Sequence, residues 1–133
     1  MNGYLLDTDI CVHAMRDRLP ILRERFNRER GKLFISVITQ AELAFGSLKS
    51  SDPSRNDARL ARLLEQLTVL SFESSVIADY AAIRLHLERS GRRIGPNDLL
   101  IAAQARAAGL VMVTANRREF DRVPGLTVEN WLV

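Results

Sequence analysis

The segment Tyr4-Leu5-Leu6-Asp7-Thr8-Asp9-Ile10-Cys11 starts as a short apolar run and then carries two carboxylates one residue apart. Such a run is typical of a buried strand. A carboxylate buried without a partner costs several kcal/mol, or its pKa rises until it holds a proton. We therefore expect a strand that ends at Asp7, and a compensating partner for these acids elsewhere in the fold.

Further short apolar or β-branched runs follow along the chain, with helical patterns between them. We expect strands at Tyr4–Asp7, Leu33–Ser36, Val69–Ser71, Leu110–Thr114 and Leu126–Glu129. We expect helices at residues 10–17, 20–30, 40–50, 54–67, 75–90 and 98–108. This alternation predicts an α/β fold in which helices cover a parallel sheet.

The helix expected at 98–108 differs from the others because its leucine, isoleucine and alanine residues leave almost no polar face. We expect it to lie deep, with its small residues close to the sheet. The segment from Ser50 to Asp57 is polar enough to form a mobile loop, but it is too short to separate domains. The sequence has no internal repeat or linker, so we expect residues 1–133 to form a single domain.

The composition narrows the class of protein. Hydrophobic residues make up 47% of the 133 residues and charged residues 26%, a balance typical of soluble globular proteins. No apolar run approaches the roughly 18 residues needed to span a bilayer, and the N-terminus lacks signal-peptide features. We therefore expect a cytoplasmic protein without a membrane partner. The single cysteine, Cys11, excludes an internal disulfide framework, and its apolar neighbours suggest a buried filler.

The basic residues are nearly all arginine. Two of the 19, Lys32 and Lys49, are lysines, so 17 are arginines, and the pI is about 9.6. Guanidinium groups match the geometry of phosphate and carboxylate groups, which is compatible with nucleic acid or an acidic protein as a partner. A GC-rich genome also produces arginine-rich proteins, so composition leaves the partner open.

Acidic and amide side chains follow the predicted strands. In open parallel sheets, ligands bind beyond the carboxyl ends of the strands. Asp7 ends the first strand, and Glu42 lies on the first turn of the helix expected after the second. Asp98 opens the apolar helix, and Asn116 follows the fourth strand. We therefore expect four separate segments to bring oxygen ligands to one rim.

Two of these residues have ordinary structural alternatives. Thr39 and Glu42 match a capping box, in which the glutamate reaches back to the start of its helix. Asp98 could complement a helix dipole beside an Asn97 cap. Both alternatives stay open at the level of sequence.

Asp9 and Asn116 could also be caps or turn formers, since both residue types are common there. Asp7 is harder to explain structurally, because a carboxylate between a strand and a helix has few ordinary structural duties. The coincidence of all these residues on one rim favours a functional site.

A cation is the partner that best compensates such a cluster. Two carboxylates about 5 Å apart repel each other by roughly 3 kcal/mol at an effective dielectric constant of about 20. Mg²⁺ or Mn²⁺ suits an Asp/Glu set without nearby histidine or cysteine. Whether one or two ions bind stays open.

Together, these motifs resemble the PIN-domain ribonuclease toxins of the VapC type over essentially the whole chain. The motifs are Leu6-Asp7-Thr8-Asp9-Ile10, the start of the Glu42 helix, Pro96–Ala103, Thr114-x-Asn116-x-x-Glu119-Phe120 and Val123–Leu126. The resemblance implies a three-layer fold with a central, mostly parallel sheet of four to five strands flanked by helices. It also implies a Mg²⁺-dependent endoribonuclease, with Mn²⁺ as an alternative ion.

Such a protein is the toxin half of a toxin–antitoxin pair, usually dimeric and held inactive by a cognate VapB-type antitoxin. The sequence does not distinguish transfer RNA from messenger RNA as the substrate.

The resemblance also assigns roles within the site. Asp7, Glu42 and Asp98 match the acidic metal ligands. Asn116 stands where PIN domains often have a further aspartate and where many toxins of this type have asparagine, and it could orient a water or a ligand. Glu119 could act through water or simply face the surface. Asp9 could hold the turn at Thr8 or act in an outer shell.

Four arginines flank these motifs and are candidates for RNA phosphate contacts: Arg92, Arg93, Arg117 and Arg118. A solvated basic surface explains them equally well. We expect His13 and His86 to be ordinary helix residues outside the site. We expect Trp131 and Phe120 to close the core.

Three other functions fit parts of the pattern. A haloacid-dehalogenase-type phosphatase also has a D-x-D after its first strand, with Asp7 as nucleophile, but it expects a downstream lysine, and none follows Lys49. The same absence counts against a response-regulator receiver. A non-catalytic module that binds RNA or an antitoxin remains open because of Asn116.

Overall fold

The computed structural model describes residues 2–133 and contains a five-stranded sheet in which every strand is parallel to its neighbours. The strands are β1 (Tyr4–Leu6), β2 (Leu33–Ser36), β3 (Thr68–Leu70), β4 (Val111–Val113) and β5 (Val128–Glu129). Their order across the sheet is β3-β2-β1-β4-β5, so the first strand lies in the centre. The predicted parallel sheet is confirmed.

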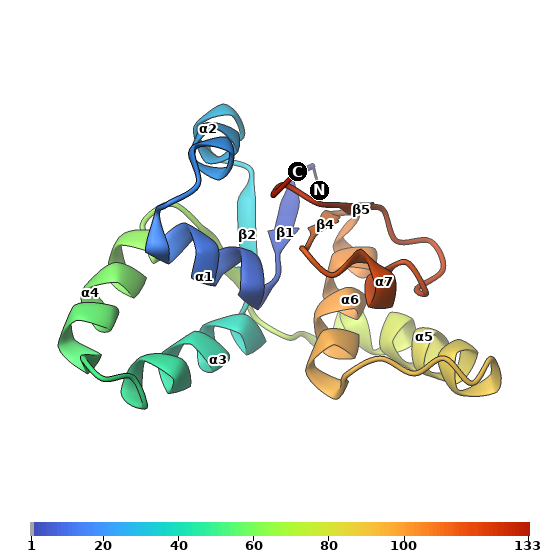
Figure 1. The fold of residues 1–133 in the computed structure, drawn as a ribbon. Coiled ribbons are helices and arrows are strands. Elements are labelled where there is room, and N and C mark those ends of the chain that lie inside the picture. The colour runs from blue at the N-terminus through green and yellow to red at the C-terminus, as the bar shows by residue number, and fades with distance from the viewer. Residues whose placement is uncertain (1) are drawn as a thin grey trace.

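Helices cover both faces of this sheet (Figure 1). They are α1 (Thr8–Arg16), α2 (Pro20–Arg28), α3 (Val37–Leu48), α4 (Pro53–Leu64), α5 (Ile77–Arg89), α6 (Pro96–Ala108) and α7 (Arg117–Phe120), with a 3₁₀ turn, η1 (Ser74–Val76), before α5. The first four helices pack on one face and the last three on the other, which gives three layers.

The two cores arise from the alternation of side chains along the strands. Leu5 and Met112 point to the face covered by α5, α6 and α7. Their neighbours Leu6 and Val113 point to the face covered by α1 to α4. Because both faces are covered, β1 and β4 in the middle of the sheet are apolar, as parallel sheets require.

Helix α6 is buried on nearly all sides, as its sequence predicts. Every residue from Ile101 to Ala105 is buried, including the polar Gln104. Cys11, Phe120 and Trp131 are also buried and pack in the two cores, which confirms the roles predicted for them. Among the helices of the described chain, none is long and apolar enough to cross a membrane.

Several predicted boundaries were wrong. Helix α3 begins at Val37, directly after β2, and Ser36 caps it by accepting a hydrogen bond from the Ile38 N–H at 3.0 Å. The capping box that stood as an alternative role for Thr39 and Glu42 is therefore absent, and Glu42, which was expected on the first turn, lies beyond it. The polar side chain closest to the end of the strand takes the capping position instead.

The other corrections have similar causes. Helix α4 already begins at Pro53, because Asp52 caps it by accepting from the Arg55 N–H at 3.2 Å, so the second half of the predicted 50–57 loop is helical. Helix α6 begins at Pro96 with Gly95 as its cap, so Asn97 is not the capping residue. Helix α7 was not predicted, because four residues are too few to show a helical period.

Candidate active site

The carboxyl ends of β1, β2 and β4 meet at one edge of the sheet because these three strands are adjacent and parallel. Asp7 follows β1 directly, α3 leaves the end of β2, and Thr114 follows β4 directly. In Figure 1 this edge lies between the start of α1, the start of α3 and the first turn of α6. The topology thus brings together segments that are far apart in the sequence.

Asp7 is the most buried acid of this edge, with 5% of its surface exposed. One carboxylate oxygen, Oδ1, caps α1 by accepting from the Ile10 N–H at 2.9 Å. The other, Oδ2, accepts from the buried Thr114 hydroxyl, which itself accepts from the Asn116 N–H at 2.9 Å. Burial raises the pKa of Asp7 to about 6, and the charges of Asp9 and Glu42 add to the rise, whereas the hydrogen bonds oppose it.

Glu42 is tied to the start of α1. The Thr8 hydroxyl donates to Glu42 Oε1 at 2.7 Å, and the hydroxyl oxygens of Thr8 and Thr39 lie 3.4 Å apart. Helix α3 therefore presents its carboxylate next to the residue that follows Asp7 in the chain. The half-buried position of Glu42 leaves its carboxylate accessible from the rim.

Asp98 lies in the first turn of α6 and has the most strongly raised carboxyl pKa of the cluster, about 7. Burial is the largest cause, followed by the negative charge of Glu119 and then that of Asp7. A hydrogen bond with Glu119 and the charge of Glu42 raise the pKa further. The three predicted ligands and Glu119 are therefore close enough to act on one another electrostatically.

Glu119 belongs to this cluster, which sequence reasoning had left undecided. It is half-buried at the end of α7, and its Oε2 accepts from the Asn116 side-chain amide at 3.1 Å. Asn116 is itself exposed and uses its amide to orient this carboxylate. Asp9 is exposed on α1, and its charge contributes to the raised pKa of Asp7.

Sequence reasoning missed the roles of Thr8 and Thr114, whose hydroxyls hold two of the carboxylates. Both residues stand within the motifs that carry the resemblance, beside Asp7 and two residues before Asn116. That position was the only signal in the chain, because the partners of these hydroxyls are remote in sequence.

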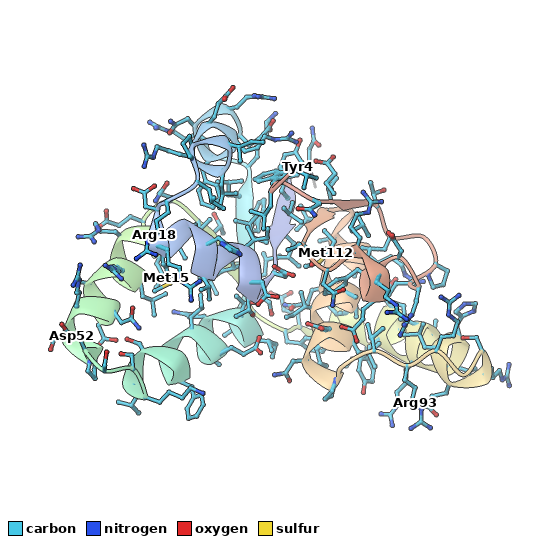
Figure 2. The ribbon with its side chains drawn as sticks, in the orientation of Figure 1. Tyr4, Met15, Arg18, Asp52, Arg93 and Met112 are labelled. Carbon is cyan, nitrogen blue, oxygen red and sulfur yellow. The ribbon has the colours of Figure 1, made fainter. Side chains whose placement is uncertain are left out.

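The four arginines predicted to contact RNA lie in different settings. Arg117 pairs with Asp121 at 3.4 Å on α7, and Arg118 beside it is exposed. Arg92 and Arg93 are exposed in the segment before α6. Figure 2 shows Arg93 beside α5, away from the sheet edge. His13 and His86 lie on α1 and α5, as expected of helix residues.

The chemistry of the cluster fits a hard divalent cation, because its donors are carboxylate oxygens whose mutual repulsion is uncompensated. Within residues 2–133, however, no three carboxylate, imidazole or thiol groups are placed to hold a metal ion by themselves. Mg²⁺ is usually bound by one or two carboxylates, with water and substrate phosphate completing its shell. The cluster fits that kind of binding rather than a closed protein cage.

Comparison with known proteins identifies the class. The PIN domain family matches residues 4–126. The chain is 41% identical over 131 residues to a tRNA(fMet)-specific endonuclease VapC of Shigella flexneri, covering 98% of this chain and 99% of that protein. It is 42% identical over 132 residues to ribonuclease VapC2 of Haemophilus influenzae, and the match covers 99% of this chain and 100% of that protein.

Solved structures agree. The crystal structure of DNA-bound VapBC from Salmonella typhimurium superposes with a TM-score of 0.94 at 39% identity, covering 98% of this chain and 99% of that one. VapBC2 from Rickettsia felis, bound to a DNA fragment from its promoter, gives a TM-score of 0.93 at 36% identity with the same coverage.

The chain therefore belongs to the PIN domain family, whose nucleases generally use divalent metal ions. Within that family it is a ribonuclease of the VapC type. The predicted family, fold class and enzyme class are confirmed, and the phosphatase, receiver and non-catalytic alternatives are set aside.

Proposed function

We propose that this chain is the toxin of a type II toxin–antitoxin pair, a Mg²⁺-dependent endoribonuclease that a VapB-type antitoxin holds inactive. The observation that carries the proposal is the group of four carboxylates at one sheet edge, with the pKa values of Asp7 and Asp98 raised by burial and by neighbouring acids. Such a group is poised to bind a divalent cation. Mn²⁺ is the alternative ion, because it prefers the same oxygen donors.

Asp7, Glu42 and Asp98 are the proposed ligand set, which would hold the ion together with water and the substrate phosphate, and Glu119 is an additional carboxylate of the same cluster. When bound, the ion supplies positive charge that stabilises the charge developing on the phosphodiester and lowers the pKa of a nearby water. Thr114 keeps Asp7 in one orientation, and Thr8 does the same for Glu42. The side-chain amide of Asn116 donates to the carboxylate of Glu119 and so holds it in one orientation.

The reaction is hydrolysis of an RNA phosphodiester. Water adds to the phosphorus, one P–O ester bond breaks, and the leaving oxygen takes up a proton. The two threonine hydroxyls contribute by fixing the carboxylates before the substrate arrives, so that little reorganisation is needed during the reaction. Asn116 is the one uncharged side chain among the proposed catalytic residues.

The Shigella relative is named a tRNA(fMet)-specific endonuclease, and the Salmonella and Rickettsia structures are VapBC complexes. By extension we propose a transfer RNA as the first substrate to test and a VapB-type protein as the partner. We further propose that residues 1–133 act as one nuclease domain, since one sheet is shared by both cores. It would work as a homodimer in the cytoplasm, where transfer RNA is found.

The test compares the wild-type chain with Asp7→Asn and Asp98→Asn on a labelled transfer RNA with Mg²⁺ and with a chelator. We expect each variant to lose at least about a hundredfold in cleavage rate, because the ion loses a charged ligand. Glu65→Gln, an exposed carboxylate at the end of α4, is the matched control and should cleave normally.

A second readout is the melting temperature with and without Mg²⁺. An ion that binds the folded chain raises the melting temperature of the wild type, and this rise should be lost in Asp98→Asn. Cleavage by purified Asp98→Asn at the wild-type rate would contradict the proposed site.

A further inference from the structure

A cavity of about 270 Å³ lies between α1, α3 and α4 and shares a wall with the carboxylate cluster. Thr8 and Glu42 line it on the side of the cluster, and Arg16 and Arg59 also line it. Thr8 and Arg16 are the first and last residues of α1, so the cavity follows this helix for roughly 12 Å. It therefore leads away from the carboxylates along the surface.

Within residues 2–133, the two arginines of this cavity take part in no ion pair, and its lining has more positive than negative side chains. Six arginines form ion pairs with carboxylates elsewhere in the molecule. Arg16 and Arg59 form none with any of residues 2–133, and their guanidinium groups donate to none of those residues. Arg59 is half-buried, and among residues 2–133 the lining sets one acid, Glu42, against these two cations. Two unpaired guanidinium groups in one cavity are suited to phosphate oxygens.

The rest of the lining is mostly apolar, with Gly46, the Ser47 hydroxyl, which donates to Asp57, and one amide. Val12, Met15 and Leu43 supply aliphatic surface, and Asn56 supplies a side chain that can both donate and accept. Figure 2 shows Met15 in the space between α1 and α4. A nucleotide presents the same combination of groups, an anionic phosphate and a flat base that packs on apolar side chains.

We propose that this cavity binds the RNA strand next to the cleaved phosphodiester, with Arg16 and Arg59 on its phosphates and an unstacked base against the apolar wall. The inference rests on the proposed ribonuclease function and adds a direction to it, since the strand leaves the carboxylate cluster along α1. RNA fits better than a protein segment, because the cleaved strand must pass beside the catalytic edge and its phosphates supply the negative charge that the two arginines lack.

The test measures RNA affinity without cleavage. Wild-type chain, Arg16→Ala, Arg59→Ala and the double variant are titrated with a fluorescein-labelled single-stranded RNA in chelator, and fluorescence anisotropy reports binding. We expect each single variant to bind about tenfold more weakly near 0.15 M salt. The slope of log affinity against log salt should fall by about 0.7 for each lost phosphate contact, and by about 1.4 in the double variant.

The matched control is Arg89→Ala. Arg89 is exposed in the last turn of α5, as Arg16 is in α1, and its removal changes the net charge equally on the opposite face of the sheet. It should leave affinity and salt slope unchanged. The variant Arg16→Lys/Arg59→Lys keeps both charges, so it should recover most of the affinity.

Unchanged RNA affinity and salt slope in the double alanine variant would overturn the inference while leaving the proposed function standing, provided that the wild type still cleaves and Asp98→Asn does not. Normal RNA binding with loss of binding to a VapB-type antitoxin would overturn it too, by assigning the cavity to the protein partner. Absence of chelator-sensitive RNA cleavage by the wild type would instead refute the proposed function itself.

Discussion

The hydroxyl of Thr114 decides how Asp7 is presented to its surroundings. It donates to Asp7 Oδ2 and accepts from the Asn116 N–H, and neither Thr114 nor Asp7 is exposed enough to exchange this partner freely for water. A buried carboxylate that loses a hydrogen bond becomes harder to ionise. One hydroxyl therefore controls both the orientation and the protonation of the most buried acid.

We expect Thr114→Val to lower the cleavage rate about 10- to 100-fold, because it removes a group that orients a proposed metal ligand. The variant should also raise the pKa of Asp7 further above about 6, since the hydrogen bond from Thr114 lowers it. Cleavage assays measure the first effect, and NMR titration of the Asp7 carboxyl carbon in metal-free protein measures the second.

Thr114→Ser keeps the hydroxyl and should retain most of the activity. Thr68→Val makes the same chemical change at an exposed position of β3 and should have no effect. Full activity and an unchanged Asp7 titration in Thr114→Val would show that the hydroxyl has no such role.

At the scale of elements, α6 determines where Asp98 lies. Its alanines at 102, 103 and 105 are fully buried, and these small side chains let the helix lie close to the sheet. Gln104 fastens the helix further, because its amide donates to the Leu70 and Ser71 carbonyls at 3.2 Å each and its carbonyl accepts from the Ser36 hydroxyl. Helix α6 is thereby joined to the carboxyl ends of β2 and β3.

Enlarging a buried residue of α6 should therefore destabilise the fold. We expect Ala103→Leu to reduce the free energy of unfolding by about 1–3 kcal/mol, because the core has no room for the added carbons. Ala107→Leu, on the exposed side of the same helix, should change it by no more than about 0.5 kcal/mol. Urea unfolding followed by circular dichroism measures both, and equal losses would argue against the close packing of α6.

At the scale of the whole molecule, the carboxylate cluster links stability to pH. The pKa of Asp7 rises from an ordinary 3.8 to about 6 and that of Asp98 from 3.8 to about 7 on folding. Between pH 4 and pH 7 the folded chain therefore binds more protons than the unfolded chain, so stability falls as the pH rises. The stability that these two carboxyl groups contribute is fully present below about pH 4 and is lost above about pH 7.

We expect the metal-free chain to lose stability across this interval, with Asp7 alone accounting for about 3 kcal/mol. Asp98→Asn should show a shallower decline, because one of the two carboxyl groups with a raised pKa is gone. Chemical unfolding at several pH values in chelator measures the slope. A decline equally steep in the variant would contradict the raised pKa of Asp98.

The order of the elements could be predicted because it depends on local patterns. The apolar runs around Leu5, Ile35 and Met112 lie in predicted strands, and the alanine-rich helix is as deep as its composition indicates. Boundaries were less accurate, since the residue that caps a helix depends on where the strand before it ends. Ser36 and Thr39 are both suitable caps by type, and only the geometry at the end of β2 selects Ser36.

The candidate site could be predicted in part. Asp7, Glu42 and Asp98 interrupt apolar patterns near the expected ends of strands and helices, so the sequence indicated them as candidate site residues. The contribution of Glu119 was not, because a glutamate on a short polar segment looks like any surface residue. Its effect on Asp98 comes from burial and proximity that no local pattern encodes.

By itself, the sequence determined the parallel α/β architecture, the deep placement of α6 and the family resemblance, since periodicity and motif spacing are properties of short stretches of chain. The tertiary structure alone decided which hydroxyl serves which acid. Thr114 and Asp7 are 107 residues apart, and Thr8 and Glu42 are 34 apart. Hydrogen bonds and desolvation depend on what surrounds a group in space, and that is settled only when the strand ends meet.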